Sequence, residues 1–309
     1  MGDGFDLGLE LVMDVRRRAE AAEHQCLDWP GGFTWWPGGV SQRVWAEPSF
    51  ALEASPSWRV QVRSGFRTAF DGSPTHLSAL TLDMTASALS AVVRDEDDRT
   101  RLELAATFHV HAGNLSWAGE LVGFVAWLQA AEAKRLAGGQ VGPGADDTLP
   151  ADAGRGFPVP SPGWLDTPRW ASGETSACVA QLASAPGVHA VSTPRGFAAS
   201  FVLADQPGVG LALLEADTGA EWPGLGRGLS VALVAPGRAG VREALALNER
   251  ETLLGWDTDL LGGWSARGEV LQHAAFFPDA LYHEGLLTAL VEDAVRRVDS
   301  VLRLGKPSA

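Results

Sequence analysis

The sequence predicts an α+β fold built from two tandem copies of one domain. The first observation is an internal repeat, in which a helical stretch, a strand hairpin and a long amphipathic helix occupy residues 75–136 and recur at 240–304. The second is a segment rich in glycine, proline and aspartate at 138–162, which separates the two copies. A repeat of this length predicts two domains packed together as a pseudo-dimer within one chain.

The domain boundaries follow from these two observations. We place the first domain at 1–137, the linker at 138–162 and the second domain at 163–309. A length of 309 residues gives each domain about 150 residues, enough for an ordinary hydrophobic core. Each domain is expected to contain, in order, a helix, three strands, a helix, two strands and a helix.

The first half opens with an expected helix over 5–26, because its apolar residues recur at helical spacing. Three strands rich in tryptophan and valine are expected within 33–70, separated by turns that contain proline or glycine. Ser73 and Pro74 then begin a helix over 74–84, since serine is a good N-cap and proline suits the first helical position.

The clearest strand of the chain is 102–110, where apolar and polar residues alternate. Its partner in a hairpin is expected at 88–94, joined to it by the acidic turn 95–98. A helix over 115–136 follows, with apolar residues at the i, i+3, i+4 and i+7 positions from Leu121 onward.

The second half repeats this order. Its elements are expected as a helix over 171–185, strands between 188 and 235, a helix over 239–250, a hairpin within 260–277 and a final helix over 282–304. The same kinds of pattern support each of them.

Two segments of the second half carry a family resemblance. They read ALALNERETLLGW (Ala244–Trp256) and GGWSARGEVLQHAAFFPDALYHEGLL (Gly262–Leu287). Their first-half counterparts read ALTLDMTASALSAVV (Ala79–Val93) and LELAATFHVHAGNLSWAGELV (Leu102–Val122). With the order of elements, these segments resemble the type III secretion chaperone-like fold and the bacterial YbjN-like proteins. The resemblance implies that the chain binds other polypeptides without catalysis and that its two copies supply a dimer covalently.

The charge of the chain narrows the kinds of partner. The formal net charge is −14, and both halves are acidic, so the surface repels nucleic acid and anionic lipid. A protein or peptide client with basic residues is favoured instead.

No apolar leader opens the chain and no apolar run approaches the roughly 20 residues of a membrane span, so we expect a cytoplasmic protein. It is expected to be a monomer with an internal pseudo-two-fold axis, or to self-associate further.

Tryptophan offers the candidate partner-binding residues. The chain has 12 tryptophans, and Trp35, Trp36 and Trp45 lie close together in the first half. Tryptophan is enriched in the most energetic parts of protein interfaces, so these three residues are candidates for contact with a client. The alternative is that they fill the hydrophobic core.

The sequence offers one candidate for catalysis. His109 and His111 are two apart on the expected strand, a spacing that lets both imidazoles reach one metal ion. The leading prediction is a non-catalytic binder without a cofactor, and the alternative is a metal-dependent or small-molecule enzyme that uses these two histidines. Cys26 and Cys178 each fall in the first helical stretch of a half and are expected to be buried thiols, with a disulfide as the alternative.

Overall fold

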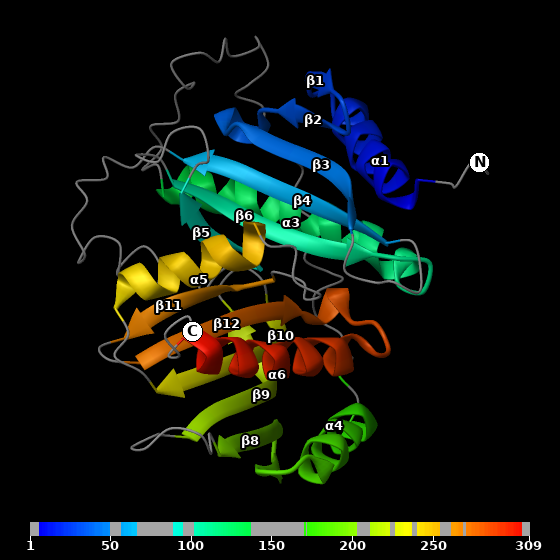
Figure 1. The fold of residues 1–309 in the computed structure, drawn as a ribbon. Coiled ribbons are helices and arrows are strands. Elements are labelled where there is room, and N and C mark those ends of the chain that lie inside the picture. The colour runs from blue at the N-terminus through cyan, green and yellow to red at the C-terminus, as the bar shows by residue number, and fades with distance from the viewer. Residues whose placement is uncertain are drawn as a thin grey trace.

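The computed structural model describes residues 6–49, 57–66, 89–94, 102–136, 170, 172–202, 211–222, 226–236, 240–253, 261–267 and 270–304. Within them the chain forms five α-helices and two six-stranded antiparallel sheets, arranged as two repeated halves (Figure 1). This arrangement confirms the prediction of an α+β fold with an internal repeat.

The elements of the first half are α1 (Leu7–Ala21), β1 (Cys26–Trp29), β2 (Gly32–Trp35), η1 (Pro37–Gly39), β3 (Gln42–Ser49), β4 (Ser57–Phe66), β5 (Ala91–Arg94), β6 (Leu102–Val110) and α3 (Leu115–Leu136). Those of the second half are α4 (Ser172–Ser184), β7 (Val188–Thr193), β8 (Gly196–Val202), β9 (Leu211–Trp222), β10 (Gly226–Pro236), α5 (Val241–Leu253), β11 (Gly263–Arg267), β12 (Val270–Pro278), η3 (Asp279–Leu281) and α6 (Leu286–Leu304).

The two sheets have the same topology. The strand order is β1-β2-β3-β4-β6-β5 in the first sheet and β7-β8-β9-β10-β12-β11 in the second. Each strand of one half therefore has a counterpart at the same position in the other. The helix expected at 74–84, the acidic turn 95–98 and the linker 138–162 lie outside the described residues.

Each half has four strands before its final hairpin, so the prediction of three was wrong. The opening helix ends at Ala21 rather than at residue 26. It stops because Glu23 adopts the left-handed conformation (φ 61°), and the next N–H, that of His24, donates to the Ala19 carbonyl at 3.0 Å. The chain then forms β1, a strand of four residues that pairs with β2 and is too short to show a periodic pattern.

Helices cover one face of each sheet and form the core there. In the first half, α1 and α3 pack on β3 and β4. Buried amides tie α3 to the sheet, since Gln129 donates to the Val62 carbonyl at 3.0 Å and Gln42 donates to the Ala126 carbonyl at 2.7 Å. In the second half, α4 and α6 pack on one face of β8 and β10. One connected cluster contains most of the buried apolar side chains of both halves, and Ala91, Val93 and Ala105 form a separate small cluster.

The two cysteines are free thiols. Cys178 lies in α4 and is buried, and burial raises the pKa of its thiol although Thr288 lies within hydrogen-bonding distance. Cys26 is half-buried at the start of β1, so its predicted place in the opening helix was wrong. Among the helices that the structure describes, none combines the length and the apolar character needed to cross a membrane.

Candidate functional site

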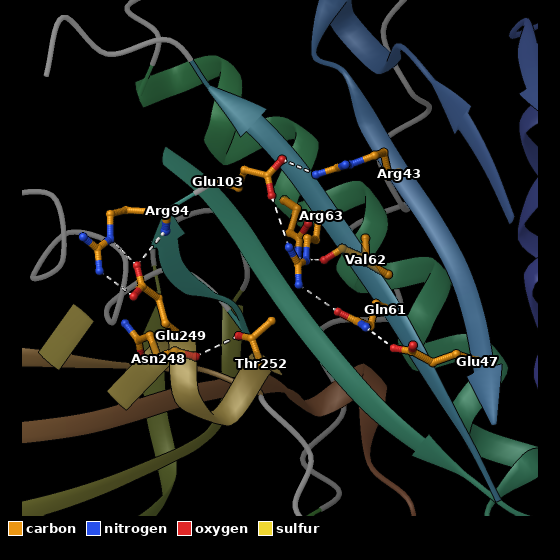
Figure 2. Close-up of polar contacts among 11 residues, drawn as sticks. Arg43, Glu47, Gln61, Val62, Arg63, Arg94, Glu103, Asn248, Glu249 and Thr252 are labelled. Carbon is orange, nitrogen blue, oxygen red and sulfur yellow. Dashed lines mark hydrogen bonds and ion pairs between the residues drawn. The ribbon is translucent and has the colours of Figure 1, made fainter. Parts of the chain in front are cut away.

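The faces of the two sheets that point away from the helices, called here the outer faces, differ sharply in chemistry. On the first sheet this face carries a buried network of charged side chains. Arg43 donates to Glu103 at 2.7 Å, and Arg63 lies 3.6 Å from the second oxygen of the same carboxylate (Figure 2). Both Arg63 and Glu103 are less than 5% exposed. Buried charges of this kind are tolerated only when they are paired, so the network organises this face.

The network extends along β4 toward the second half. Arg63 donates to the Gln61 side chain at 3.2 Å, and Gln61 in turn donates to Glu47. Glu47 also pairs with Arg59, which donates from its remaining nitrogen to the Thr252 carbonyl at 3.2 Å. Because that carbonyl lies in the last turn of α5, the guanidinium also stabilises the negative end of this helix. The outer face of the first sheet is thus tied to the second half.

Trp45 is the predicted partner-binding residue that lies on this outer face. It is half-buried, with Arg63 and Arg43 over its ring at 5.3 and 5.9 Å from the centroid. Trp29 packs beside it, at 5.9 Å between ring centroids. Cation–π contacts therefore hold the ring in place within the charged network.

Trp35 and Trp36 lie elsewhere. Trp35 is fully buried on the core face, and its indole N–H donates to Gln42 at 2.8 Å. Trp36 follows it and is 7% exposed. Neither offers an extended surface to a partner, so the structure brings Trp35 and Trp36 into the interior and separates them from Trp45. A role in binding stays a prediction for all three residues.

The outer face of the second sheet is open and largely apolar. Val191, Leu213 and Val202 are 44%, 49% and 60% exposed. The strand register places all three on the same face as Glu215, which is exposed and has no ion-pair partner within the described part of the chain. We call this surface the open face. Its other members include the small or aliphatic residues Ala198, Ser200, Ala232, Val234 and Ala274, and the larger residues His189, Gln272 and Phe276.

The two halves meet at equivalent edge strands, β5 and β11, and Asn248 of α5 joins them. Its side-chain amide donates to the Val92 carbonyl and to the Trp264 carbonyl, both at 3.1 Å. Its side-chain oxygen accepts the Trp264 backbone N–H at 2.8 Å. A β-carbon at Gly263 would lie 3.0 Å from the Ala91 α-carbon, so the two edges approach closely. One fully buried amide therefore satisfies backbone groups of both edges.

An ion pair reinforces this junction. Arg94 of β5 places two of its nitrogens on the carboxylate of Glu249 in α5, one of them at 2.6 Å (Figure 2). The hydrogen bonds with Glu249 raise the pKa of Arg94. Thr252 donates to the Asn248 carbonyl at 2.8 Å, so the side chains on this part of α5 are held in one arrangement.

A second buried polar cluster lies where α5, α6 and the second sheet meet. Glu251 accepts from Arg297 at 2.9 Å and also from the Trp264 indole N–H. His273 packs edge-on against the Trp264 ring, with the centroids 5.4 Å apart. Burial and, to a lesser extent, the positive charge of Arg297 lower the pKa of His273 well below its usual value, so this imidazole is neutral.

The two histidines of the predicted metal site lie in different surroundings. His109 is 8% exposed on the outer face of β6, whereas His111 follows the end of the strand and accepts the Gly113 N–H at 3.1 Å. Within the described residues, no three His, Cys, Asp or Glu side chains are grouped as metal ligands. The metal-dependent alternative stays a prediction that no observed contact favours.

Comparison of the chain with protein-family models, curated proteins and solved structures found no match. The resemblance to secretion chaperones and YbjN-like proteins therefore rests on the sequence segments alone.

Proposed function

We propose that this chain is a non-catalytic scaffold that binds a polypeptide client on the open face of its second sheet. One observation carries the proposal: three large apolar side chains, Val191, Val202 and Leu213, are about half exposed on one face around the carboxylate of Glu215, which has no ion-pair partner among the described residues. Contiguous apolar patches that are exposed on a protein surface often mark sites of interaction with other molecules.

The shape of the face suits a polypeptide that lies flat on it. Alanine and serine side chains occupy the rows between the larger ones, as at Ala198, Ala232 and Ala274. Small side chains on a sheet let a helix or an extended segment approach its surface closely. A client would cover the exposed parts of Leu213 and Val202 and place a basic group against Glu215.

Charge supports a basic client. Glu215 has no ion-pair partner within the described residues, and the whole chain carries a net charge of −14. A lysine or arginine at the centre of the client's apolar surface would pair with Glu215, and the wider negative field would speed its approach.

The junction supports the scaffold part of the proposal. We interpret the two halves as a pseudo-dimer of the chaperone-like kind that the sequence suggests, because equivalent edge strands meet as they do in an isologous dimer. Asn248 and the pair Arg94–Glu249 would hold the second sheet in one orientation relative to the first. A rigid sheet loses little conformational freedom when a client binds.

The test is a selection of peptides from a random display library against the wild-type chain, in the presence of excess soluble Leu213→Asp variant. The competitor removes peptides that bind elsewhere. We expect the selected peptides to combine apolar and basic residues. Full burial of a leucine side chain is worth about 1.5–3 kcal/mol. Leu213 is 49% exposed in the free chain, so a client could bury about half of this side chain. Leu213→Ser should therefore weaken binding about fivefold.

Two further variants control this test. Glu215→Gln keeps the size of the side chain and should weaken binding of basic peptides, with the difference from wild type disappearing at high salt. Leu27→Ser removes an equally exposed apolar side chain from β1 and should have no effect, since Leu27 is 61% exposed but lies on the other sheet. Peptides that bind wild type and Leu213→Ser equally well would refute the proposed site.

A further inference from the structure

The two outermost strands of the molecule, β1 and β7, occupy equivalent positions but are protected differently. Figure 1 places β1 at one end of the molecule and β8, the only described strand paired with β7, at the other. β1 has four residues, and one of them, Asp28, accepts two hydrogen bonds from the Arg16 guanidinium at 2.6 and 2.9 Å. β7 has six residues and contains neither a charged residue nor a proline. Charged residues, prolines and short length are what natural proteins use to stop edge strands from pairing.

The register of β7 shows which of its backbone groups are free to pair. The Val202 N–H donates to the Gly187 carbonyl at 2.9 Å, so the residues of β7 that bond to β8 are the odd-numbered ones. The backbone N–H and C=O groups of Ala190 and Ser192 consequently point away from the sheet. Ser192 is exposed and Ala190 is half-buried, and because α4 also contacts β7, a second strand would approach these groups alongside α4.

We propose that β7 is a self-association surface, where two copies of this chain pair antiparallel through their β7 strands. The two-fold axis would pass between Val191 and Val191 of the second copy. In this register Ala190 bonds with Ser192 of the second copy, and the reverse bonds follow by symmetry. Twelve strands of two second sheets would then form one continuous sheet.

The composition of β7 is what selects a second copy as the occupant. Two chains that each carry a net charge of −14 repel one another, and like charges directly opposite each other on paired strands are destabilising. The uncharged β7 avoids this cost at the point of contact. Val191, 44% exposed in the single chain, would pack against its own copy, and His189 would face Thr193 of that copy. This inference goes beyond client binding, because it requires no client.

The first experiment measures mass by sedimentation velocity on the full chain at concentrations from 1 to 200 µM. We expect a reversible shift toward twice the 32.6 kDa of one chain. Ser192→Pro removes an N–H that points to solvent, so the bonds between β7 and β8 remain. Each dimer loses two hydrogen bonds in this variant, and its dissociation constant should rise about 30-fold. Leu27→Lys, on the β1 edge, is the matched control and should leave the mass distribution unchanged.

The second experiment tests the register by cysteine cross-linking under mild oxidation. In the proposed register, the two copies of residue 191 lie directly opposite each other and make no hydrogen bonds to each other. The α-carbons of such a pair are about 4.5 Å apart, which is within disulfide range, so Val191→Cys should form an intermolecular disulfide. His189→Cys alone should not form one, because the two copies of residue 189 would be about 14 Å apart along the strands. His189→Cys combined with Thr193→Cys should cross-link.

Several outcomes would overturn the proposal. One is a chain that remains monomeric throughout the concentration range, whether or not another extended polypeptide pairs with β7. Another is a dimer whose dissociation constant is the same for Ser192→Pro as for wild type, which would place the contact elsewhere. Val191→Lys provides a second variant should Ser192→Pro fail to fold, and it should also weaken the dimer because it places two positive charges opposite each other. Client binding is tested separately, since Leu213→Ser should leave the dimer mass unchanged.

Discussion

Replacing Asn248 with alanine tests whether the contact between β5 and β11 holds the two halves together. The side chain is fully buried and makes three hydrogen bonds to backbone groups, one to Val92 and two to Trp264. Asn248 therefore makes side-chain hydrogen bonds to both edge strands. Alanine removes all three bonds and creates a small cavity between the two edges.

The expected loss of stability follows from the groups left without partners. Each buried backbone group that loses its hydrogen bond costs about 1–3 kcal/mol, and three such groups result. Water that enters the vacated space recovers part of this cost. We therefore expect Asn248→Ala to lower the free energy of unfolding by about 3–5 kcal/mol, which lowers the urea midpoint by about 1 M for a chain of this size.

The assay is urea unfolding followed by far-ultraviolet circular dichroism and by tryptophan fluorescence. The wild-type halves share one buried apolar cluster, so both signals should change in one transition. In Asn248→Ala the halves are coupled more weakly, and the two signals should separate.

Asn114→Ala is the matched control, because Asn114 is a buried amide whose two bonds, to His109 and His111, lie within the first half. It should lower stability while the two signals still coincide. A loss below about 1 kcal/mol in Asn248→Ala, or separated transitions in the control alone, would refute the role assigned to Asn248.

Three further predictions concern the other polar contacts. A double-mutant cycle on Arg94→Ala and Glu249→Ala should give a coupling energy of about 1 kcal/mol that decreases with added salt, because Arg94 is about one-third exposed. Glu103→Ala should cost about 3–5 kcal/mol in urea unfolding because it removes the carboxylate that faces the buried guanidinium of Arg63, and adding Arg63→Met should recover much of the loss. His273 is neutral in the folded chain and protonates when unfolded, so acid favours the unfolded state. The stability that the neutral imidazole contributes is fully present above pH 6.5 and is lost as the pH falls below that value. His273→Phe should therefore reduce the slope of the unfolding free energy against pH by the equivalent of one bound proton.

Each of these has a result that would contradict it. A salt-independent coupling between Arg94 and Glu249 would show that the pair is screened from solvent, contrary to its exposure. Stability that Arg63→Met fails to restore would mean that the cost in Glu103→Ala arises from packing rather than from the unpaired charge. An unchanged slope in His273→Phe between pH 5 and 7 would mean that the imidazole is protonated in the folded chain.

The internal repeat was predictable because its helices and hairpins have strong periodic patterns. The alternation over 102–110 and the apolar stripe of the last helix correspond to β6 and α6. β1 was missed since four residues show no period, and a left-handed Glu23 gave no signal in the sequence.

The candidate site was harder to predict because it depends on contacts between distant residues. Asn248 lies within the segment Ala244–Trp256 that carries the resemblance, but its bond to Val92 joins positions 156 apart. Leu213 and Leu214 are adjacent in β9, so their side chains point to opposite faces of the second sheet. This pair of leucines was the sign in the sequence that both faces carry apolar residues. The composition did not show that Trp35 lies in the interior, where its indole N–H donates to Gln42.

The shared topology of the two halves has a consequence for how such a molecule can change over time. In a dimer of identical subunits every substitution occurs twice, so both subunits must present the same surface. Here each copy has its own codons. One copy uses a β-sheet surface for internal ion pairs such as Arg43–Glu103, while the matching surface of the other copy exposes apolar side chains such as Leu213. Two copies within one chain can differ in this way, whereas identical subunits cannot.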